Sequence, residues 1–311
     1  MQVLRYSPGA LPSSPDRRTG ALDLEGAYRL LSRAEWGPAL LFCPADRPDR
    51  YPKALAAADA VVIDLEDAVG PDRKDSARRT LEDAARWLPP ERTIVRVNAL
   101  GTAWAEADLA MLRSTPLRHV MVPKAEDPAA VGALAPFQVV ALCETARGVM
   151  RAPELAAAAN CTALFWGGED LIADLGGWRS RREDGSYLPV VVHARCTVLL
   201  AAAAQRKPAW DGVYLDIDDL DGLAAESAEA VDMGFAAKVA IHPSHAAVIR
   251  TAFTPGDQRV EWAHALLATA QRSSGVSRFR GRMIDGPLIT QAQAVLARAA
   301  PPRPDSPTDQ S

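Results

Sequence analysis

The stretch AVVIDLE, residues 60–66, places an apolar run rich in β-branched residues directly before two carboxylates, Asp64 and Glu66. A run that is apolar at successive positions is typical of a strand buried on both faces, as in a parallel sheet covered by helices. Alternate residues of a strand point to the same side, so Asp64 and Glu66 share one side. The stretch therefore predicts a buried parallel strand with acidic groups at its carboxyl end. Asp67 points the other way and is interpreted as a helix-start residue.

Seven further runs of this kind alternate with longer helical stretches along the chain. They are ALLFCPA (39–45), TIVRVN (93–98), HVMVPKA (119–125), FQVVALCE (137–144), ALFWGGED (163–170), GVYLDI (212–217) and KVAIHP (238–243). Strands that alternate with helices pair in parallel through right-handed crossovers, and eight such units predict a (β/α)8 TIM barrel. The alternative is an open doubly wound sheet, but FCPADRPDR after the first strand lacks the glycines of a phosphate-binding turn.

The composition is that of an ordinary globular protein, with 311 residues, 48% hydrophobic and 24% charged. A net charge of -4 without a basic stripe predicts no nucleic-acid partner, and the absence of a long apolar run predicts no membrane span. Four cysteines without CxxC spacing, and no secretory leader, predict a cytoplasmic protein with reduced thiols. We expect a flexible N-terminal segment (1–24), one barrel domain (25–299) whose C-terminal helical extension includes a lid or exchange segment (272–299), and a disordered tail (300–311).

Chemically active residues follow almost every expected strand. They are Arg47, Asp64 with Glu66, Arg96, Lys124, Glu144, Asp170, Asp216 and His242. In a TIM barrel the carboxyl ends of the strands form the active-site face, so we expect these side chains to converge. Glu144 and Asp170 follow neighbouring strands and together resemble the one or two carboxylates with which proteins bind Mg²⁺. Zn²⁺ is less favoured because no histidine has an i, i+4 partner, whereas Mn²⁺ remains an alternative.

Nine sequence blocks resemble, in order and spacing, the citrate lyase β-subunit-like proteins of the HpcH/HpaI aldolase superfamily, whose relatives include malyl-CoA and citramalyl-CoA lyases. The blocks are LFCPADRPDRYPKAL, VVIDLEDAV, TIVRVNAL, VMVPKAE, LCETARGV, FWGGEDLIADLG, DGVYLDIDD, KVAIHPSH and GRMIDGPL. They extend from about residue 38 to 297. The resemblance is specific for the family and much less so for the substrate.

The resemblance implies a role for each matching residue. Glu144 and Asp170 are expected to bind Mg²⁺, and Arg96 to contact the substrate carbonyl or enolate oxygen, with Asp64 and Glu66 around it. Three basic residues that match the region meeting the CoA phosphates are Arg47, Arg50 and Lys53. The aspartate of MIDGPL, Asp285, matches a residue that relatives supply from a neighbouring subunit, which implies a homo-oligomer, a trimer or hexamer.

Several of these residues have simpler interpretations that stay open. Asp285 suits the N-cap of a helix over 287–299, and the basic trio suits a solvated helix face. Lys124 is a Schiff-base candidate by residue type, although a charge-partner or phosphate-binding role is favoured. Where many relatives have Gly-Asn, this chain has Ala45 and Asp46. The Asp46 carboxylate is a candidate partner for Arg47, which would weaken a contact of Arg47 with a CoA phosphate.

The resemblance implies a Mg²⁺-dependent carbon–carbon lyase that cleaves or forms a 3-hydroxyacyl-CoA, such as malyl-, citramalyl- or citryl-CoA, with an acyl-CoA and a 2-oxo acid as the other side of the reaction. The alternatives are a malyl-CoA-type thioesterase or a malate synthase on the same scaffold, a citrate lyase β-chain that needs partner subunits, and a thioester-binding protein without catalysis.

Overall fold

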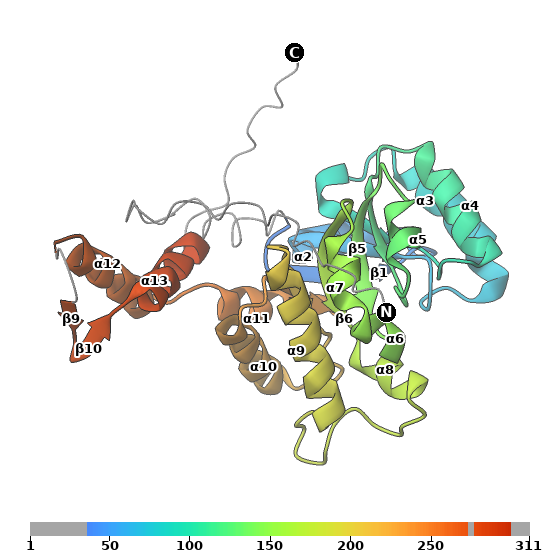
Figure 1. The fold of residues 1–311 in the computed structure, drawn as a ribbon. Coiled ribbons are helices and arrows are strands. Elements are labelled where there is room, and N and C mark those ends of the chain that lie inside the picture. The colour runs from blue at the N-terminus through green and yellow to red at the C-terminus, as the bar shows by residue number, and fades with distance from the viewer. Residues whose placement is uncertain (1–35, 273–276, 300–311) are drawn as a thin grey trace, which may run out of the picture.

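The computed structural model describes residues 36–272 and 277–299, so the expected N-terminal segment (1–24) and tail (300–311) lie outside the described residues. Eight parallel strands close into a barrel in chain order, which confirms the predicted TIM barrel (Figure 1). The strands are β1 (Ala39–Pro44), β2 (Ala60–Asp64), β3 (Thr93–Arg96), β4 (His119–Val122), β5 (Gln138–Cys143), β6 (Cys161–Trp166), β7 (Ala209–Asp211) and β8 (Ala237–Ala240).

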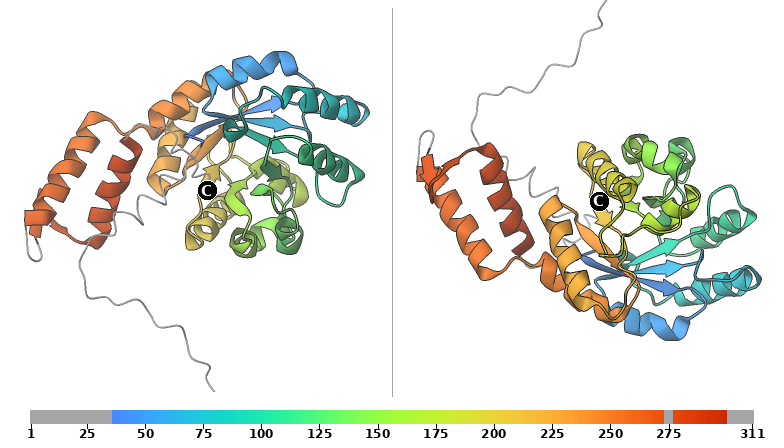
Figure 2. Two further views of the ribbon diagram at one scale, coloured as in Figure 1. Left: turned by 90° about the horizontal axis from the view of Figure 1, so that it is seen from above. Right: turned by 90° about the horizontal axis from the view of Figure 1, so that it is seen from below.

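Helices connect the strands and cover the outside of the barrel, as the two opposite views in Figure 2 show. They are α2 (Tyr51–Ala57), α3 (Lys74–Ala84), α4 (Ala103–Arg113), α5 (Pro128–Gly132), α6 (Ala146–Met150), α7 (Ala152–Ala157), α8 (Gly168–Asp174), α9 (Pro189–Ala204), α10 (Leu220–Met233) and α11 (Pro243–Phe253). Short 3-10 turns, η1 (Pro48–Arg50), η2 (Pro71–Arg73) and η3 (Pro90–Arg92), precede α2, α3 and β3.

The barrel interior is filled by side chains from alternate strand positions. Leu40, Val62, Ile94 and Val140 belong to this inner apolar cluster and are fully buried. At the end where the strands begin, Trp36 packs edge-on against Trp210 and His119. Because side chains repeat every second residue, the next inward positions after Val62 and Ile94 are Asp64 and Arg96. The two-residue alternation that places apolar side chains in the core thus places polar side chains at the opposite, carboxyl end of the barrel.

The predicted position of the seventh strand was wrong. The seventh strand is Ala209–Asp211, and GVYLDI (212–217) lies in the connection to α10. Asp211 fixes this register because its fully buried carboxylate accepts hydrogen bonds from Lys238 at 2.7 Å and from Arg195 at 2.9 Å. A buried carboxylate needs such partners, and only this placement sets Asp211 opposite Lys238. The sixth run was also predicted too long, since α8 begins at Gly168.

The C-terminal extension forms an arm with a small core of its own. It consists of α12 (Asp257–Arg272), the antiparallel hairpin of β9 (Ser277–Phe279) and β10 (Arg282–Ile284), and α13 (Gly286–Ala299). In Figures 1 and 2 the arm projects away from the barrel. Within the described part of the chain, no helix has the length and apolar character needed to cross a membrane.

Candidate active site

A bidentate ion pair joins Asp64 and Arg96 at the carboxyl ends of β2 and β3. The guanidinium donates from Nε to Asp64 Oδ1 at 2.7 Å and from Nη2 to Oδ2 at 2.6 Å. The two residues are also register partners, so the strands themselves bring the groups together. The opposite side of the fork meets Glu66, whose Oε2 lies 3.2 Å from Nη1. Two carboxylates therefore fix the orientation of Arg96, as the sequence predicted for their positions.

Lys124 extends this cluster toward strands β5 and β6. Its Nζ donates to Glu66 Oε1 at 2.6 Å and lies 3.8 Å from Glu144 Oε1 and 3.7 Å from Asp170 Oδ1. The backbone of Lys124 has φ +47°, a conformation uncommon outside glycine, and its N–H donates to Glu144 Oε1 at 3.0 Å. Both the main chain and the side chain of Lys124 thus face the acidic pair.

Glu144 and Asp170 differ in their surroundings. Glu144 follows β5 and is 2% exposed, whereas Asp170 lies in the first turn of α8 and its side chain is 40% exposed. A Cβ on Gly167 would stand 3.0 Å from Glu144 Oε2, so a glycine at this turn leaves room for the carboxylate. The pair therefore combines one deeply buried carboxylate with one that is open to solvent.

Burial and neighbouring charges shift the pKa values of Glu144 and Lys124. Burial, with the charges of Asp170 and Glu66, raises the pKa of Glu144 to about 8. For Lys124, burial disfavours the charged form, but the contact with Glu66 outweighs it and the pKa rises above its usual range. A lysine that forms a Schiff base usually has a lowered pKa, so the raised pKa of Lys124 and its three carboxylate neighbours favour a charge-partner role.

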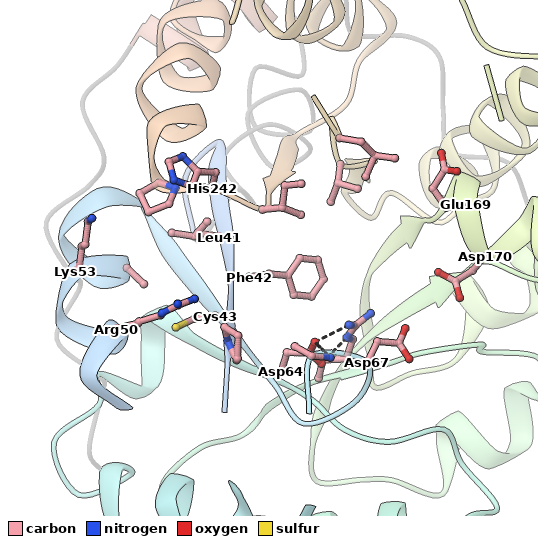
Figure 3. A pocket seen from close by; sticks show the side chains of 18 residues that line it. Leu41, Phe42, Cys43, Arg50, Lys53, Asp64, Asp67, Glu169, Asp170 and His242 are labelled. Atoms are coloured by element: carbon pink, nitrogen blue, oxygen red, sulfur yellow. Dashed lines mark hydrogen bonds and ion pairs between the residues drawn. The ribbon is translucent and has the colours of Figure 1, made fainter. Parts of the chain in front are cut away.

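A cavity of about 810 Å³ opens above this cluster (Figure 3). Its volume lies within the range of roughly 300–1,000 Å³ that is usual for small-molecule and cofactor sites. Polar and charged residues on its wall are Arg50, Lys53, Asp64, Asp67, Arg96, Glu169, Asp170 and His242, and its apolar residues include Leu41, Phe42, Val213, Leu215 and Ile241. In Figure 3 the basic residues Arg50 and Lys53 lie across the cavity from Glu169 and Asp170, with apolar side chains between them.

The expected basic trio is divided by the structure. Arg50 and Lys53 line the cavity, whereas Arg47 is not among its lining residues. Arg47 instead donates to Asp49 at 3.0 and 2.9 Å on the surface. The acid beside Arg47 pairs elsewhere: Asp46, a candidate partner for Arg47 in the sequence, forms an ion pair with Arg73. The local turn η1 explains this, because it brings Asp49 beside Arg47.

Two further acids lie at positions that the sequence left open. Asp67 lines the cavity, and the next helical turn begins only at Pro71, so its interpretation as a helix-start residue was wrong. Asp285 accepts a hydrogen bond from the Leu288 N–H at 3.1 Å at the start of α13, which confirms the predicted N-cap contact. It lies on the arm, which extends away from the chain's own barrel in Figure 1.

Sequence reasoning missed two residues that shape the site. The Phe42 ring lies 4.7 Å from the Arg96 guanidinium carbon, a cation–π contact that packs the apolar side of the guanidinium. Its signal was available, since Phe42 is at an inward position of β1. Glu169 lines the cavity and accepts a hydrogen bond from Ser180, which ties the loop after α8 to the residue beside Asp170. Nothing in the local sequence indicates that contact.

The donor set suits a magnesium or manganese ion with an incomplete protein shell. Among residues 36–272 and 277–299, no group of three or more His, Cys, Asp or Glu is placed to hold a metal ion alone. Glu144 and Asp170 supply two hard oxygen donors, and Mg²⁺ commonly takes one or two carboxylates with waters and substrate oxygens. Gly167 lets the chain pass close to Glu144, since a Cβ there would stand 3.0 Å from Oε2 of this donor.

The closed parallel barrel and the charged cluster at its carboxyl rim together define a TIM-barrel protein with an enzyme-type site. The family model of the HpcH/HpaI aldolase/citrate lyase family matches residues 39–243. The chain belongs to this family of aldolase and citrate lyase enzymes, which confirms the resemblance found in the sequence.

Several curated proteins and solved structures are similar over most of the chain. A citrate lyase subunit beta-like protein of Mycobacterium tuberculosis is 49% identical, covering 85% of this chain and 96% of its own. A (3S)-malyl-CoA thioesterase of Cereibacter sphaeroides is 34% identical, covering 84% and 94%. A crystal structure of the protein CitE from M. tuberculosis, in complex with magnesium, acetoacetate and coenzyme A, superposes with a TM-score of 0.82 at 49% identity, covering 86% of this chain and 99% of that one.

Proposed function

We propose that this protein is a Mg²⁺-dependent carbon–carbon lyase of the reversible Claisen type, which acts on a 3-hydroxyacyl-CoA such as malyl-, citramalyl- or citryl-CoA. The observation that carries the proposal is the Arg96 guanidinium, which Asp64 and Glu66 fix at a cavity that Asp170 also lines. Glu144 lies close to Asp170, since both are within 4 Å of Lys124 Nζ. The relative that binds magnesium, acetoacetate and coenzyme A in its crystal structure supports the same ligand classes here.

In the cleavage direction the 3-hydroxyl loses its proton and its carbon becomes the carbonyl of a 2-oxo acid. The bond between C2 and C3 breaks, and its electron pair forms the enolate of the acyl thioester. The enolate then takes a proton at C2 and leaves as acyl-CoA. The protein must therefore stabilise a negative oxygen and supply a proton on the side of C2.

Arg96 is the group suited to the negative oxygen. Its fork is held by two carboxylates and by the Phe42 ring, so little reorganisation is needed when charge develops in the substrate. Bound by Glu144 and Asp170, Mg²⁺ would polarise the carbonyl of the 2-oxo acid as a Lewis acid. Asp64 and Glu66 act through Arg96 by orienting it.

Arg50 and Lys53 are proposed to hold the CoA phosphates at the cavity entrance. Both line the cavity and both extend from the segment after β1. Arg47 is proposed to join them from the surface, where a phosphate would have to compete with Asp49 for its guanidinium. Phosphate groups suit such cations because each contact is charge-assisted.

Asp285 is proposed as the proton donor or acceptor, supplied by the arm of a neighbouring subunit in a homo-oligomer, a trimer or hexamer. The carboxylate caps α13 at an exposed position, and the arm leaves its own barrel. An exposed acid on a projecting arm can reach another molecule's cavity more readily than its own. The cap and the proton transfer are compatible, since the cap uses only Oδ1.

A thioesterase is the second candidate, because a (3S)-malyl-CoA thioesterase is among the 34% identical relatives. The test is to incubate the protein and Mg²⁺ with malyl-, β-methylmalyl-, citramalyl- and citryl-CoA while measuring 2-oxo acid and free thiol together. The lyase produces 2-oxo acid without thiol. Thiol without 2-oxo acid would identify the thioesterase, and neither product from any of the four would reject both.

A further inference from the structure

Lys124 is the one described residue whose ammonium lies within 4 Å of three carboxylates of the active-site cluster, those of Glu66, Glu144 and Asp170. Its backbone occupies the left-handed region at φ +47°, where a residue other than glycine is costly. The same conformation directs the Lys124 N–H to Glu144. The backbone is therefore in an unfavourable conformation at Lys124, the residue whose ammonium lies beside Glu144 and Asp170.

The formal charges of the cluster can be counted from its ion-paired side chains. Its acids are Asp64, Glu66, Glu144 and Asp170, and its bases are Arg96 and Lys124. With all six ionised, four negative and two positive charges leave two negative charges. One divalent cation would neutralise this remainder, whereas the same acids without Lys124 would leave three.

We propose that Lys124 is a positioning residue that sets the charge preference and affinity of the metal site, holding Glu66 away from the metal and matching the cluster to a divalent ion. This inference rests on the proposed metal site at Glu144 and Asp170. The ammonium both repels an incoming cation and keeps Glu66 engaged at 2.6 Å. Without it, Glu66 becomes a third carboxylate near the ion and the repulsion is lost.

The test is calorimetric titration of the full-length protein with Mn²⁺ in the absence of substrate, followed by competition with Tb³⁺. Lys124→Met should bind Mn²⁺ at least about tenfold more tightly, because a charge within 4 Å of the ligands is removed, even with some solvent screening. Its preference for Tb³⁺ over Mn²⁺ should also rise. Lys124→Gln, which can still donate to Glu66, should shift in the same direction.

Two controls separate charge position from charge number. Arg86→Met removes an equal charge from an exposed surface position, so its Mn²⁺ affinity should stay within about threefold of wild type. The double variant Glu66→Gln/Lys124→Met restores two net negative charges and should return toward wild-type affinity.

Unchanged or weaker Mn²⁺ binding by both Lys124→Met and Lys124→Gln, with binding by the wild type intact, would overturn this inference alone. A wild-type protein that binds no Mn²⁺ at millimolar concentration would overturn the metal assignment of the proposed function and this inference with it.

Discussion

Arg96 and Asp64 meet as a bidentate pair between register partners on β2 and β3, with both hydrogen bonds at 2.7 Å or less. Neighbouring parallel strands carry residues of the same register to the same height, so the fold sets the pair without a loop. Both groups are nearly buried, and a buried charged group needs a partner of this kind. Several measurable consequences follow from this cluster.

Replacing Arg96 by lysine keeps the charge and removes the planar fork. We expect kcat to fall by about 10²–10³, the usual cost of losing a preorganised donor to a developing negative oxygen. KM for the thioester should change much less. Steady-state kinetics on the wild type, Arg96→Lys and the distant surface variant Arg86→Lys would show this; equal kcat for all three would remove Arg96 from the chemistry.

Glu144→Gln and Asp170→Asn should each weaken Mn²⁺ binding by more than about a hundredfold, since even an outer partner of a metal ligand contributes 10–100-fold. Turnover that is sensitive to EDTA should be lost with it. Glu169→Gln is the matched control, because Glu169 also lines the cavity but is engaged by Ser180. Full metal binding in both ligand variants would contradict the assignment.

The raised pKa of Glu144, about 8, predicts a pH dependence of metal binding. Below that pKa the ion must displace a proton, so the apparent Kd for Mn²⁺ should rise by about tenfold for each unit of pH below 8. Without metal, the stability of the fold changes with pH in the opposite direction. The pKa of Glu144 in the folded protein lies above its ordinary value of 4.5, so the contribution of Glu144 to folding stability is fully present below pH 4.5 and is lost as the pH rises through 8. Added Mg²⁺ should therefore raise the melting temperature more at pH 8.5 than at pH 6.5.

Glu144→Gln is the control for this pH dependence. Glutamine at the same position cannot titrate, so neither the metal-free stability nor the remaining weak binding should follow pH in this window. The measurement is the melting temperature of the wild type with and without Mg²⁺ at pH 6.5 and at pH 8.5. If Glu144 titrated in the ordinary range, Mg²⁺ would raise the melting temperature equally at the two pH values.

Mixing two inactive variants tests whether Asp285 acts across a subunit interface. Arg96→Ala lacks the oxygen-binding group and Asp285→Ala lacks the proton-transfer group, so a mixed oligomer contains some sites with both residues intact. We expect partial recovery of turnover after the two proteins are co-refolded or exchanged. Activity that stays at the level of either parent would place Asp285 within its own barrel or outside the reaction.

Much of this fold was predictable because one physical pattern repeats. Apolar runs such as residues 60–64 end in polar groups, and that pattern placed Asp64, Arg96 and Glu144 at one rim. The seventh strand was not predictable by hydropathy, since Asp211 lies inside it and its carboxylate is satisfied by Lys238, Arg195 and Trp166 from other elements.

The detail of the site depends on contacts that no local pattern encodes. The left-handed backbone of Lys124 and the close approach of Gly167 to Glu144 appear only when β4, β5 and β6 are assembled. For Lys124 the sequence favours a charge-partner or phosphate-binding role over a Schiff base, but only the structure shows its three carboxylate neighbours. Family resemblance likewise predicted the residue types of the CoA region, but it did not predict that Arg47 pairs with Asp49.

The most direct test of the central claim is to follow citramalyl-CoA with the protein and Mg²⁺ in D₂O by NMR and mass spectrometry. Cleavage through an enolate protonated by the enzyme predicts equal amounts of pyruvate and acetyl-CoA, with one deuterium per molecule in the acetyl methyl group. Citramalate and free CoA, without pyruvate and without deuterium in an acyl product, would contradict it.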